Sequence, residues 1–177
     1  MFHRIVVATD GSDHATKAIA VAGDLAAKYD AEITLLHVFL RRNAEATDLR
    51  RIVDVQKLPQ KVREEFERFE RMQEKRKTSA ATAVAVSIPF PEDVLVGVGH
   101  AIVDKAEDIA KQHGARKIDR VITEGDPADL ILKTAKGKDA DLIVMGTRGL
   151  SDFTGLFVGS VSHKVSHLAD CTCITVR

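Results

Sequence analysis

One stretch of this sequence decides the fold: Asp141-Leu-Ile-Val-Met-Gly-Thr-Arg-Gly149, followed after nine residues by Gly159-Ser160. The residues up to Met145 have the continuous apolar character of a buried parallel strand. Gly146 and Gly149 follow where the chain must leave the sheet and turn sharply, and glycine allows the backbone to come close to a ligand. The pattern G-x2-G-x9-G-S therefore predicts a strand, a glycine loop and a helix in succession.

The segment that begins at Gly159 predicts a site for an anion. Apolar residues recur at Val161, Val165 and Leu168, which is a helical spacing. The start of a helix presents free N–H groups and the positive end of the helix dipole. Together with Arg148, whose guanidinium can fork onto oxygens, this start predicts a phosphate cradle. The glycines alone are also consistent with an ordinary strand end and helix start, and Arg148 with an exposed side chain.

Strands alternate with amphipathic helices along the rest of the chain. Strands are expected at about residues 4–9, 33–38, 119–123, 141–145 and 171–176. Helices are expected from Ser12 as N-cap, over 94–112, and from Asp126-Pro127 to about Gly137. Such alternation predicts an α/β fold with a mostly parallel sheet, right-handed crossovers and helices on both faces. Ligands of such sheets bind beyond the carboxyl ends of the strands, where the glycine loop and the turn after the first strand both lie.

Further motifs accompany the glycine loop. The N-terminal block Arg4-Ile-Val-Val-Ala-Thr-Asp-Gly-Ser12 combines a strand with a tight turn, and Ile33-Thr-Leu-Leu-His-Val38 ends in a His-Val pair. A last block, Cys171-Thr-Cys-Ile-Thr-Val-Arg177, has the character of a terminal strand. In the order and spacing of these blocks the chain resembles the universal stress protein family, except between about Phe39 and Pro91.

This resemblance implies an open, five-stranded, Rossmann-like sheet of strand order 3-2-1-4-5, and a bound ATP or AMP, with or without Mg²⁺. It also implies a regulator of the stress response. Adenine is expected near Asp10 and the backbone of Val38, ribose near Thr9 and Gly146, and phosphates along the glycine loop. The expected nucleotide-binding residues are Ala8, Thr9, Asp10, Val38, Met145, Gly146, Arg148, Gly149, Gly159, Ser160, Val161 and Ser162. From its Thr-Asp-Gly-Ser setting alone, Asp10 is also consistent with a turn residue that caps the next helix.

Known catalytic signatures are absent from the sequence. It has no G-x4-G-K-[ST] string, no G-x-G-x-x-G after the first strand, and neither H-x-G-H nor S-G-G-x-D-S of adenylyltransferases. Gly97-Val-Gly99 lacks the third glycine of a dinucleotide motif. No general base stands out, so no catalytic residue is expected. Two alternatives stay open: a slow ATPase, since bound ATP and a metal ion need only a positioned water, and a dimeric interaction module in which the nucleotide is structural.

Charge and composition argue against several classes of protein. The 26 basic and 26 acidic residues balance, so nothing favours a nucleic-acid partner. The apolar run from Ile5 to Ala8 is too short for a signal peptide, and no stretch approaches the ~20 apolar residues of a spanning helix. A cytoplasmic protein without a membrane span is therefore expected. We interpret the two cysteines as packed thiols, and His163 with His167 lack a third metal ligand.

A divergent insertion at about 41–91 interrupts the single domain expected for residues 1–177. Residues 41–77 carry 12 basic and 8 acidic side chains, and a narrow apolar seam within them predicts a helix that packs by one edge. The seam consists of Val62, Phe66, Phe69 and Met72. Residues 78–91 have no charge and are too few to span a bilayer. A packed helix with a loop, a lid over the site, and a contact with a protein partner all stay open.

The terminal strand at 171–176 is expected at an edge of the sheet, where its outer backbone groups lack partners. In the family that the sequence resembles, this edge pairs with a two-fold mate. A homodimer through residues 171–176 is therefore expected.

Overall fold

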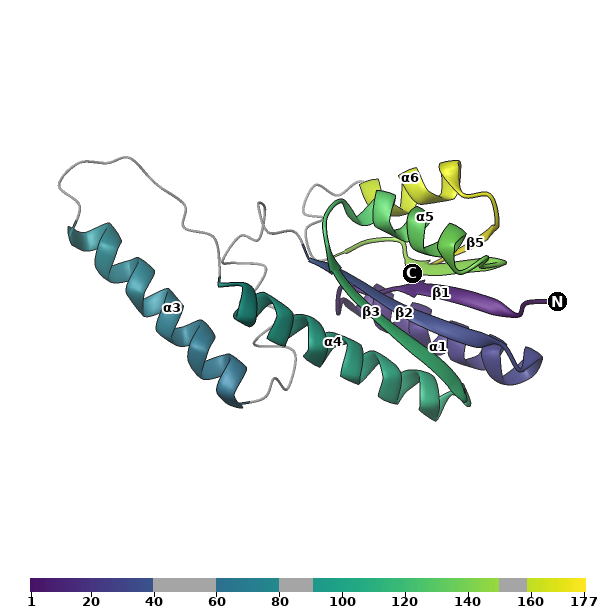
Figure 1. Cartoon of the computed structure of the whole chain (residues 1–177), viewed down its shortest axis with the longest axis horizontal. Coiled ribbons are helices and arrows are strands. Elements are labelled where there is room, and N and C mark those ends of the chain that lie inside the picture. The colour runs from purple at the N-terminus through teal and green to yellow at the C-terminus, as the bar shows by residue number, and fades with distance from the viewer. Residues whose placement is uncertain (40–59, 80–90, 150–158) are drawn as a thin grey trace.

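A computed structural model describes residues 1–39, 60–79, 91–149 and 159–177 of the chain (Figure 1). The strands are β1 (Arg4–Ala8), β2 (Glu32–Phe39), β3 (Lys117–Glu124), β4 (Leu142–Gly146) and β5 (Thr172–Val176). The helices are α1 (Asp13–Tyr29), α3 (Gln60–Ser79), α4 (Glu92–Gln112), α5 (Pro127–Gly137) and α6 (Ser160–Leu168). The expectations for the start of the insertion, for nearly all of its uncharged segment and for the middle of the glycine loop fall outside the described residues.

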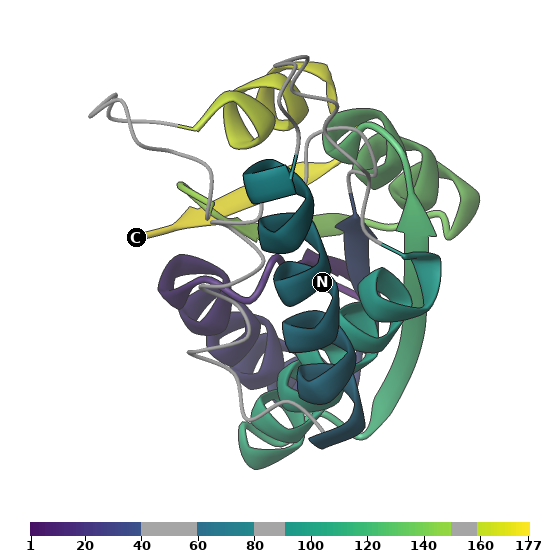
Figure 2. The ribbon, with the colours of Figure 1, turned by 90° about the vertical axis from the view of Figure 1, so that its left-hand side faces the viewer.

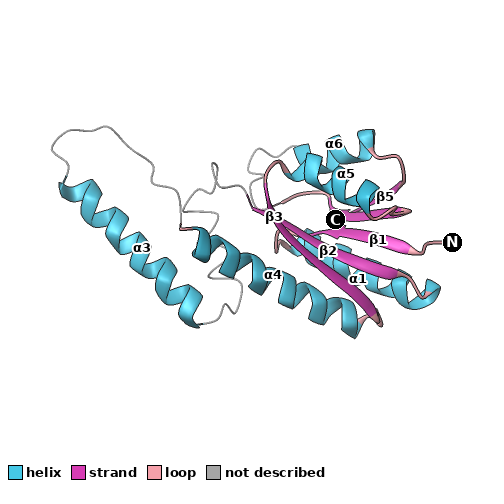
Figure 3. Ribbon diagram, viewed as in Figure 1, coloured by secondary structure: helices cyan, strands magenta, loops and turns pink. Residues whose placement is uncertain are grey.

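The five strands form one parallel sheet of order β3-β2-β1-β4-β5, so the expected fold class and strand order are confirmed (Figure 3). β1 lies in the centre, where Ala8 pairs with Leu36 of β2 on one side and with Met145 of β4 on the other. Because β1 and β4 are neighbours that run in the same direction, the turns that follow them leave from the same edge of the sheet.

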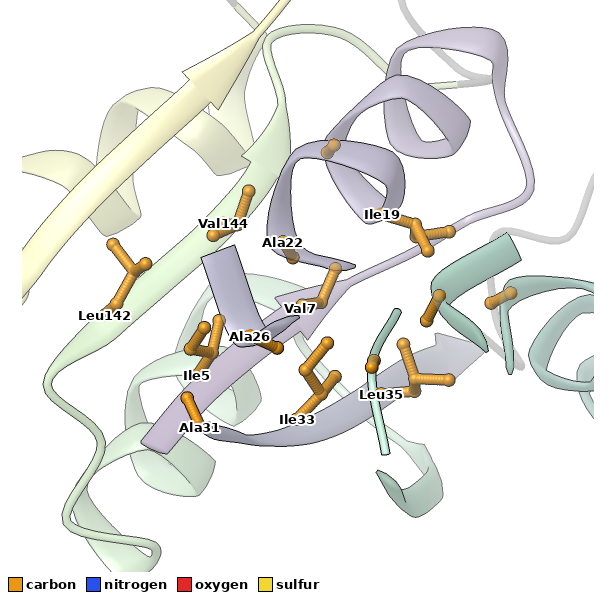
Figure 4. Close-up of a cluster of buried hydrophobic side chains, with 14 of the residues drawn as sticks. Ile5, Val7, Ile19, Ala22, Ala26, Ala31, Ile33, Leu35, Leu142 and Val144 are labelled. Atoms are coloured by element: carbon orange, nitrogen blue, oxygen red, sulfur yellow. The ribbon is translucent and has the colours of Figure 1, made fainter. Parts of the chain in front are cut away.

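Each face of the sheet buries its own apolar cluster, since alternate residues of a strand point to opposite faces. On one face, Val7, Leu35 and Val144 pack against α1 and α4 (Figure 4). On the other face, Val6 and Ile143 pack against α5 and α6. Figures 1 and 2 show the two pairs of helices as layers on either side of the sheet, which confirms the expected layering.

Two helices begin with the capping chemistry that the sequence predicts. The hydroxyl of Ser12 accepts a hydrogen bond from the N–H of Ala15 at 3.2 Å. The carboxylate of Asp126 accepts one from the N–H of Asp129 at 3.0 Å. Such bonds satisfy N–H groups that the first helical turn leaves without a partner. Because of the cap at Ser12, α1 begins immediately after the turn that follows β1 in the sequence.

β3 is longer than the expected strand at 119–123, because it pairs along the whole of β2, from Lys117 opposite Glu32 to Glu124 opposite Phe39. Its charged residues are Lys117, Asp119, Arg120 and Glu124. A charged edge strand resists pairing with another sheet. The two edges of this sheet therefore differ, since β5 contains no charged residue.

The insertion contributes α3, which packs on α4 (Figure 1). Phe66 is 1% exposed and lies in an apolar cluster with residues of α4. Val62 comes so close that a Cβ built on Gly97 of α4 would lie 2.9 Å from its Cγ2. The expected seam is confirmed for Val62, Phe66 and Phe69, but it is wrong for Met72, which is 54% exposed. Of the α3 side chains that the structure describes, Val62, Phe66 and Phe69 belong to the cluster with α4.

Candidate functional site

The turn after β1 and the loop after β4 meet at the carboxyl edge of the sheet. A Cβ built on Gly149 would stand 2.5 Å from Oδ2 of Asp10. Real Cβ atoms essentially never come closer than 3.0 Å to another heavy atom, so a side chain at position 149 would require the Asp10 carboxylate to move. The N-terminal and C-terminal parts of the sequence pattern therefore converge on one place.

The turn after β1 holds the Asp10 carboxylate. Its Oδ1 accepts a hydrogen bond from the N–H of Ser12 at 3.0 Å, and the Thr9 hydroxyl accepts one from the N–H of Gly11 at 3.2 Å. Gly11 has a φ of +85°, a conformation that favours glycine. Because Ser12 caps α1, Asp10 is a turn residue but not the helix cap, and its Oδ2 faces the glycine loop.

Gly146 is required by packing between β4 and α1. A Cβ at this position would lie 2.8 Å from Cβ of His14 and 3.0 Å from the backbone nitrogen of Ala15. The start of α1 therefore lies directly on the end of β4. The glycine that the sequence analysis expected beside ribose thus has a packing role that holds with or without a ligand.

Two residues that the sequence analysis missed join this contact, His14 and Thr147. Thr147 is buried, and its Oγ1 lies 3.1 Å from Nδ1 of His14. The hydroxyl of Ser12 also points to the carbonyl oxygen of Arg148, at 3.5 Å. Alternate residues from Asp10 to His14 therefore contact successive residues of the loop. No sequence signal marks His14 or Thr147, because a lone histidine in a first helical turn has many uses.

The helix α6 begins against the same loop. Gly159 takes the N-cap position with φ −70° and ψ 151°, and its N–H donates to the carbonyl oxygen of Thr147 at 2.8 Å. The first helical hydrogen bond runs from the N–H of His163 to the carbonyl oxygen of Gly159 at 3.0 Å. The N–H groups of residues 160–162 therefore precede the first helical bond, and these are the groups that a phosphate site needs.

The two serines at this helix start differ in accessibility. Ser162 is buried, and its hydroxyl lies 2.9 Å from the carbonyl oxygen of Thr147 and 3.0 Å from that of Gly159. Its proton is thus used to hold the loop on the helix. The side chain of Ser160 is exposed. A ligand can reach the hydroxyl of Ser160, whereas Ser162 offers its backbone N–H.

Arg148 provides a positive charge beside the loop. Its side chain is half-buried. Its guanidinium forms no ion pair with any carboxylate in the part of the chain that the structure describes. The adjacent Gly149 is exposed, so the charge and the glycine loop lie on the same accessible edge.

β2 extends beyond the end of β1. The last pair between them is Ala8 with Leu36, after which the N–H of Thr9 donates to the carbonyl oxygen of Leu36 at 2.9 Å. Val38, two residues further on, directs its N–H and C=O to the same side as Leu36, where β1 has already turned away. Ala8 and Met145 form the last pair between β1 and β4, and Met145 is buried, so these two residues hold the two turns in register.

His37 supports the turn after β1. Its ring is buried, and Nδ1 lies 2.9 Å from the carbonyl oxygen of Thr9. A carbonyl oxygen only accepts, so Nδ1 carries the hydrogen and donates it. Burial lowers the pKa of His37 below its ordinary value of 6.5, against smaller opposing effects of the bond to Thr9 and the charge of Asp10, so the ring is neutral at pH 7. In the sequence, His37 is marked only as part of a His-Val pair.

The remaining sequence expectations concern metal, membrane and thiols. Across the described ranges, no three His, Cys, Asp or Glu side chains are grouped so that they could hold a metal ion. None of the helices in those ranges has the length and apolar character needed to cross a membrane. Cys171 and Cys173 are free, partly buried thiols, and burial raises the pKa of both.

The fold is that of an open, parallel, doubly wound α/β protein. Its first and fourth strands end in a carboxylate turn and a glycine loop beside the start of α6, at the carboxyl edge where ligands of such sheets generally bind. The chain belongs to the universal stress protein family, which it matches over residues 1–177. It is 33% identical to universal stress protein YxiE of Bacillus subtilis (strain 168) and 32% identical to a universal stress protein of Thermus aquaticus. Both alignments cover 100% of this chain and of the relative.

Solved structures share this fold. Universal stress protein UspA from Lactobacillus plantarum is 21% identical and has a TM-score of 0.66, with coverage of 99% of this chain and 98% of that chain. A universal stress protein in complex with cAMP is 24% identical, with a TM-score of 0.61 over 99% and 97% of the two chains. The universal stress protein from Archaeoglobus fulgidus in complex with dAMP is 17% identical, with a TM-score of 0.59 over 99% and 98%.

Proposed function

We propose that this protein binds an adenine nucleotide, ATP or AMP, where the turn after β1 meets the glycine loop after β4, and that the nucleotide regulates it in a stress response. The observation that carries the proposal is the contact of Asp10 with Gly149 beside the open start of α6. Acceptors suited to adenosine and donors suited to phosphate then share one edge of the sheet. Two structures of this fold hold cAMP and dAMP, which supports adenine as the base.

In this proposal the phosphates lie at the start of α6. The N–H groups of residues 160–162 and the exposed hydroxyl of Ser160 donate to phosphate oxygens, and Arg148 adds a positive charge. The N–H of Gly159 is already used on Thr147. Gly159 therefore contributes by having no side chain rather than as a donor.

The adenosine lies toward β1 and β2. An adenine edge both donates and accepts, which suits the N–H and C=O that Val38 directs past the end of β1. A carboxylate only accepts, so Asp10 suits the amino or hydroxyl donors of adenosine. The backbone of Thr9 and Gly146, between these groups and the loop, then lies beside the ribose.

We assign binding and no catalytic residue. Within the described residues no group of three or more His, Cys, Asp or Glu side chains could hold a metal ion. We propose that Mg²⁺ binds mainly through the phosphate oxygens of the nucleotide and through water. Mg²⁺ is commonly bound in this way, through substrate phosphates and few protein groups. Hydrolysis of ATP would then depend on a water molecule that no assigned protein group positions, which is consistent with a slow reaction at most.

A homodimer through β5 is the second part of the proposal. The N–H of Thr147 donates to the carbonyl oxygen of Val176, so Val176 and, by alternation, Ile174 direct their backbone groups to β4. Cys173 and Thr175 direct theirs to the open edge. This edge carries no charge, unlike that of β3, and an uncharged open edge favours pairing with another strand.

We also propose that the insertion belongs to the same domain, since Phe66 packs on α4, and that its outer surface is available to a protein partner. A competing role is that of an interaction module in which the nucleotide only stabilises the dimer. The two roles differ in one observable. A regulatory nucleotide requires that ATP and AMP give different dimer or partner affinities, since a ligand shifts an equilibrium only through differential affinity.

The test begins with mass-spectrometric identification of what co-purifies with the protein, followed by titration calorimetry with ATP and adenosine. Gly159→Val should abolish binding, because its side chain fills the space of the phosphate. Ser160→Ala should weaken ATP by about ten- to a hundredfold through loss of one hydroxyl contact to a charged group. Arg148→Ala should lower the affinity for ATP more than the affinity for adenosine. Unchanged ATP affinity in folded Gly159→Val would show that the loop is only a structural turn.

A further inference from the structure

His37 occupies a position that the proposed nucleotide contacts do not use. It lies opposite Ile122 in the pairing of β2 with β3, and it is 6% exposed. Its Nδ1–H donates to the carbonyl oxygen of Thr9 at 2.9 Å. The buried ring of His37 therefore links β2 to the backbone that follows β1, and this link needs a functional or structural explanation.

The hydrogen bond takes the place of the next pair of the sheet. The pairing of β1 with β2 ends at Ala8 and Leu36. In a continued parallel ladder, the carbonyl oxygen of Thr9 would accept from the N–H of Val38. His37 donates to that oxygen instead, and among the described residues the backbone hydrogen bonds of the turn include none from Val38 to Thr9. The N–H of Val38 therefore stays available to a ligand.

The same bond acts on the peptide group that leads into Asp10. The carbonyl of Thr9 belongs to the planar peptide that joins Thr9 to Asp10. Fixing this carbonyl fixes the plane of the peptide, and with it the direction in which the carboxylate of Asp10 leaves the turn. One imidazole N–H thus acts on both expected adenosine contacts, Val38 and Asp10.

The helix α4 holds the ring from the other side. A Cβ built on Gly99 would lie 3.1 Å from Cδ2 of His37 and 3.1 Å from Cγ2 of Ile122, so the bare backbone of Gly99 leaves room for the ring. Gly97 has a different neighbour, since its Cβ would lie 2.9 Å from Cγ2 of Val62 in α3. Two glycines on one helix therefore serve separate contacts.

We propose that His37 is a positioning residue for adenosine: it orients the Thr9–Asp10 peptide and keeps the N–H of Val38 open, and α4 sets the place of its ring through Gly99. This inference rests on the proposed nucleotide site. Loss of the Nδ1–H donor should lower the affinities for adenosine and for ATP by the same factor, because the phosphate contacts at α6 are untouched. A purely structural histidine would lower stability without changing affinity in this pattern.

The variants His37→Asn and His37→Leu form a matched pair. Their side chains are close in size, but only asparagine carries an N–H that can replace Nδ1–H. His37→Leu should lower the affinity for both adenosine and ATP by about tenfold, and His37→Asn should restore most of that loss. Titration calorimetry measures both ligands, and thermal unfolding of each variant reports stability separately.

The variants Gly99→Ala and Gly97→Ala test the role of α4, also where His37→Leu does not fold. Both replace a helical glycine, so both gain the same helix propensity. Alanine at position 99 presses on His37 and Ile122 and should lower adenosine affinity several-fold. Alanine at position 97 presses on Val62 and should leave that affinity unchanged while it loosens α3.

The unmodified protein separates the two possible failures. If it binds neither adenosine nor ATP, the proposed function is wrong, and the inference falls with it. If it binds both, but His37→Leu equals His37→Asn in affinity, or Gly99→Ala equals Gly97→Ala, then His37 is only structural and the inference alone is overturned.

Discussion

The contact between Gly149 and Asp10 allows a sharp test of the candidate site. In Gly149→Ala, the new Cβ would start 2.5 Å from Oδ2 of Asp10, and this gap must open to more than 3.0 Å. The carboxylate is the end of a short side chain and moves more easily than the backbone of β1 or α1. The variant should therefore fold, with the carboxylate rotated away from the loop.

The rotation should change binding through the loss of one contact. Oδ1 of Asp10 accepts from the N–H of Ser12 at 3.0 Å, so the carboxylate can turn only by disturbing this bond or by moving Oδ2 away from its present direction. Oδ2 then no longer faces the ligand. A hydrogen bond to a charged carboxylate contributes about 1.5–3 kcal/mol, or about ten- to a hundredfold in Kd. We expect the affinities for adenosine and for ATP to fall equally, by this factor.

Titration calorimetry with adenosine and ATP measures the effect, on variants whose unfolding temperature has been recorded. Gly137→Ala is the matched control, because a Cβ on Gly137 of α5 would meet nothing within 4 Å, and it should leave both affinities unchanged. Unchanged adenosine affinity in Gly149→Ala would refute the role of Asp10 as an adenosine contact. A loss confined to ATP would place Gly149, rather than Asp10, beside the ligand, at its phosphates.

Other expected results concern the dimer, α3 and pH. Thr175→Pro removes a donor from the open edge of β5 and should shift dimer to monomer in light scattering, and a monomeric unmodified protein at micromolar concentration would contradict the dimer. Phe66→Ala should weaken docking of α3 by about 3 kcal/mol or more, seen as faster hydrogen exchange over residues 60–79; unchanged exchange there would count against that contact. Burial lowers the pKa of His37 below 6.5, so its contribution is present above that pH and lost as pH falls toward the folded-state pKa. Denaturation of unmodified protein and His37→Asn should diverge below pH 6.5, and parallel curves would contradict this.

The elements of the sheet could be predicted because their signals are local. A continuous apolar run marks β4, and the caps at Ser12 and Asp126 mark helix starts through chemistry confined to a few neighbouring residues. The order of the strands in the sheet could not be predicted from local signals. Periodicity shows which elements exist but not which strands pair, so the order 3-2-1-4-5 came from the resemblance to a family. The extra length of β3 depends on pairing along the whole of β2, which no local pattern contains.

The candidate site could be predicted only in part, for a related reason. The loop pattern includes Gly149, but the carboxylate that excludes a side chain there lies at the other end of the chain. Gly146 was expected beside a ligand, and that stays a prediction; its packing against α1, where a Cβ would lie 2.8 Å from Cβ of His14, was not foreseen. His37 and Thr147 were missed because their hydrogen bonds join elements far apart in sequence. Met72 continued a helical pattern but is 54% exposed, because a pattern does not show which of its positions contact a neighbouring helix.

The glycine loop and the terminal strand are joined at Thr147, and this suggests how a nucleotide could act on the dimer. The N–H of Thr147 donates to the carbonyl oxygen of Val176, and its own carbonyl oxygen accepts from the N–H of Gly159, each at 2.8 Å. A ligand at the start of α6 therefore acts on the residue that holds the end of β5. A tenfold preference of ATP over AMP for the dimer requires about 1.4 kcal/mol, which is within the net contribution of one hydrogen bond. Dimer dissociation constants measured with ATP, with AMP and without nucleotide would test this coupling, since equal constants would leave the nucleotide as structural support only.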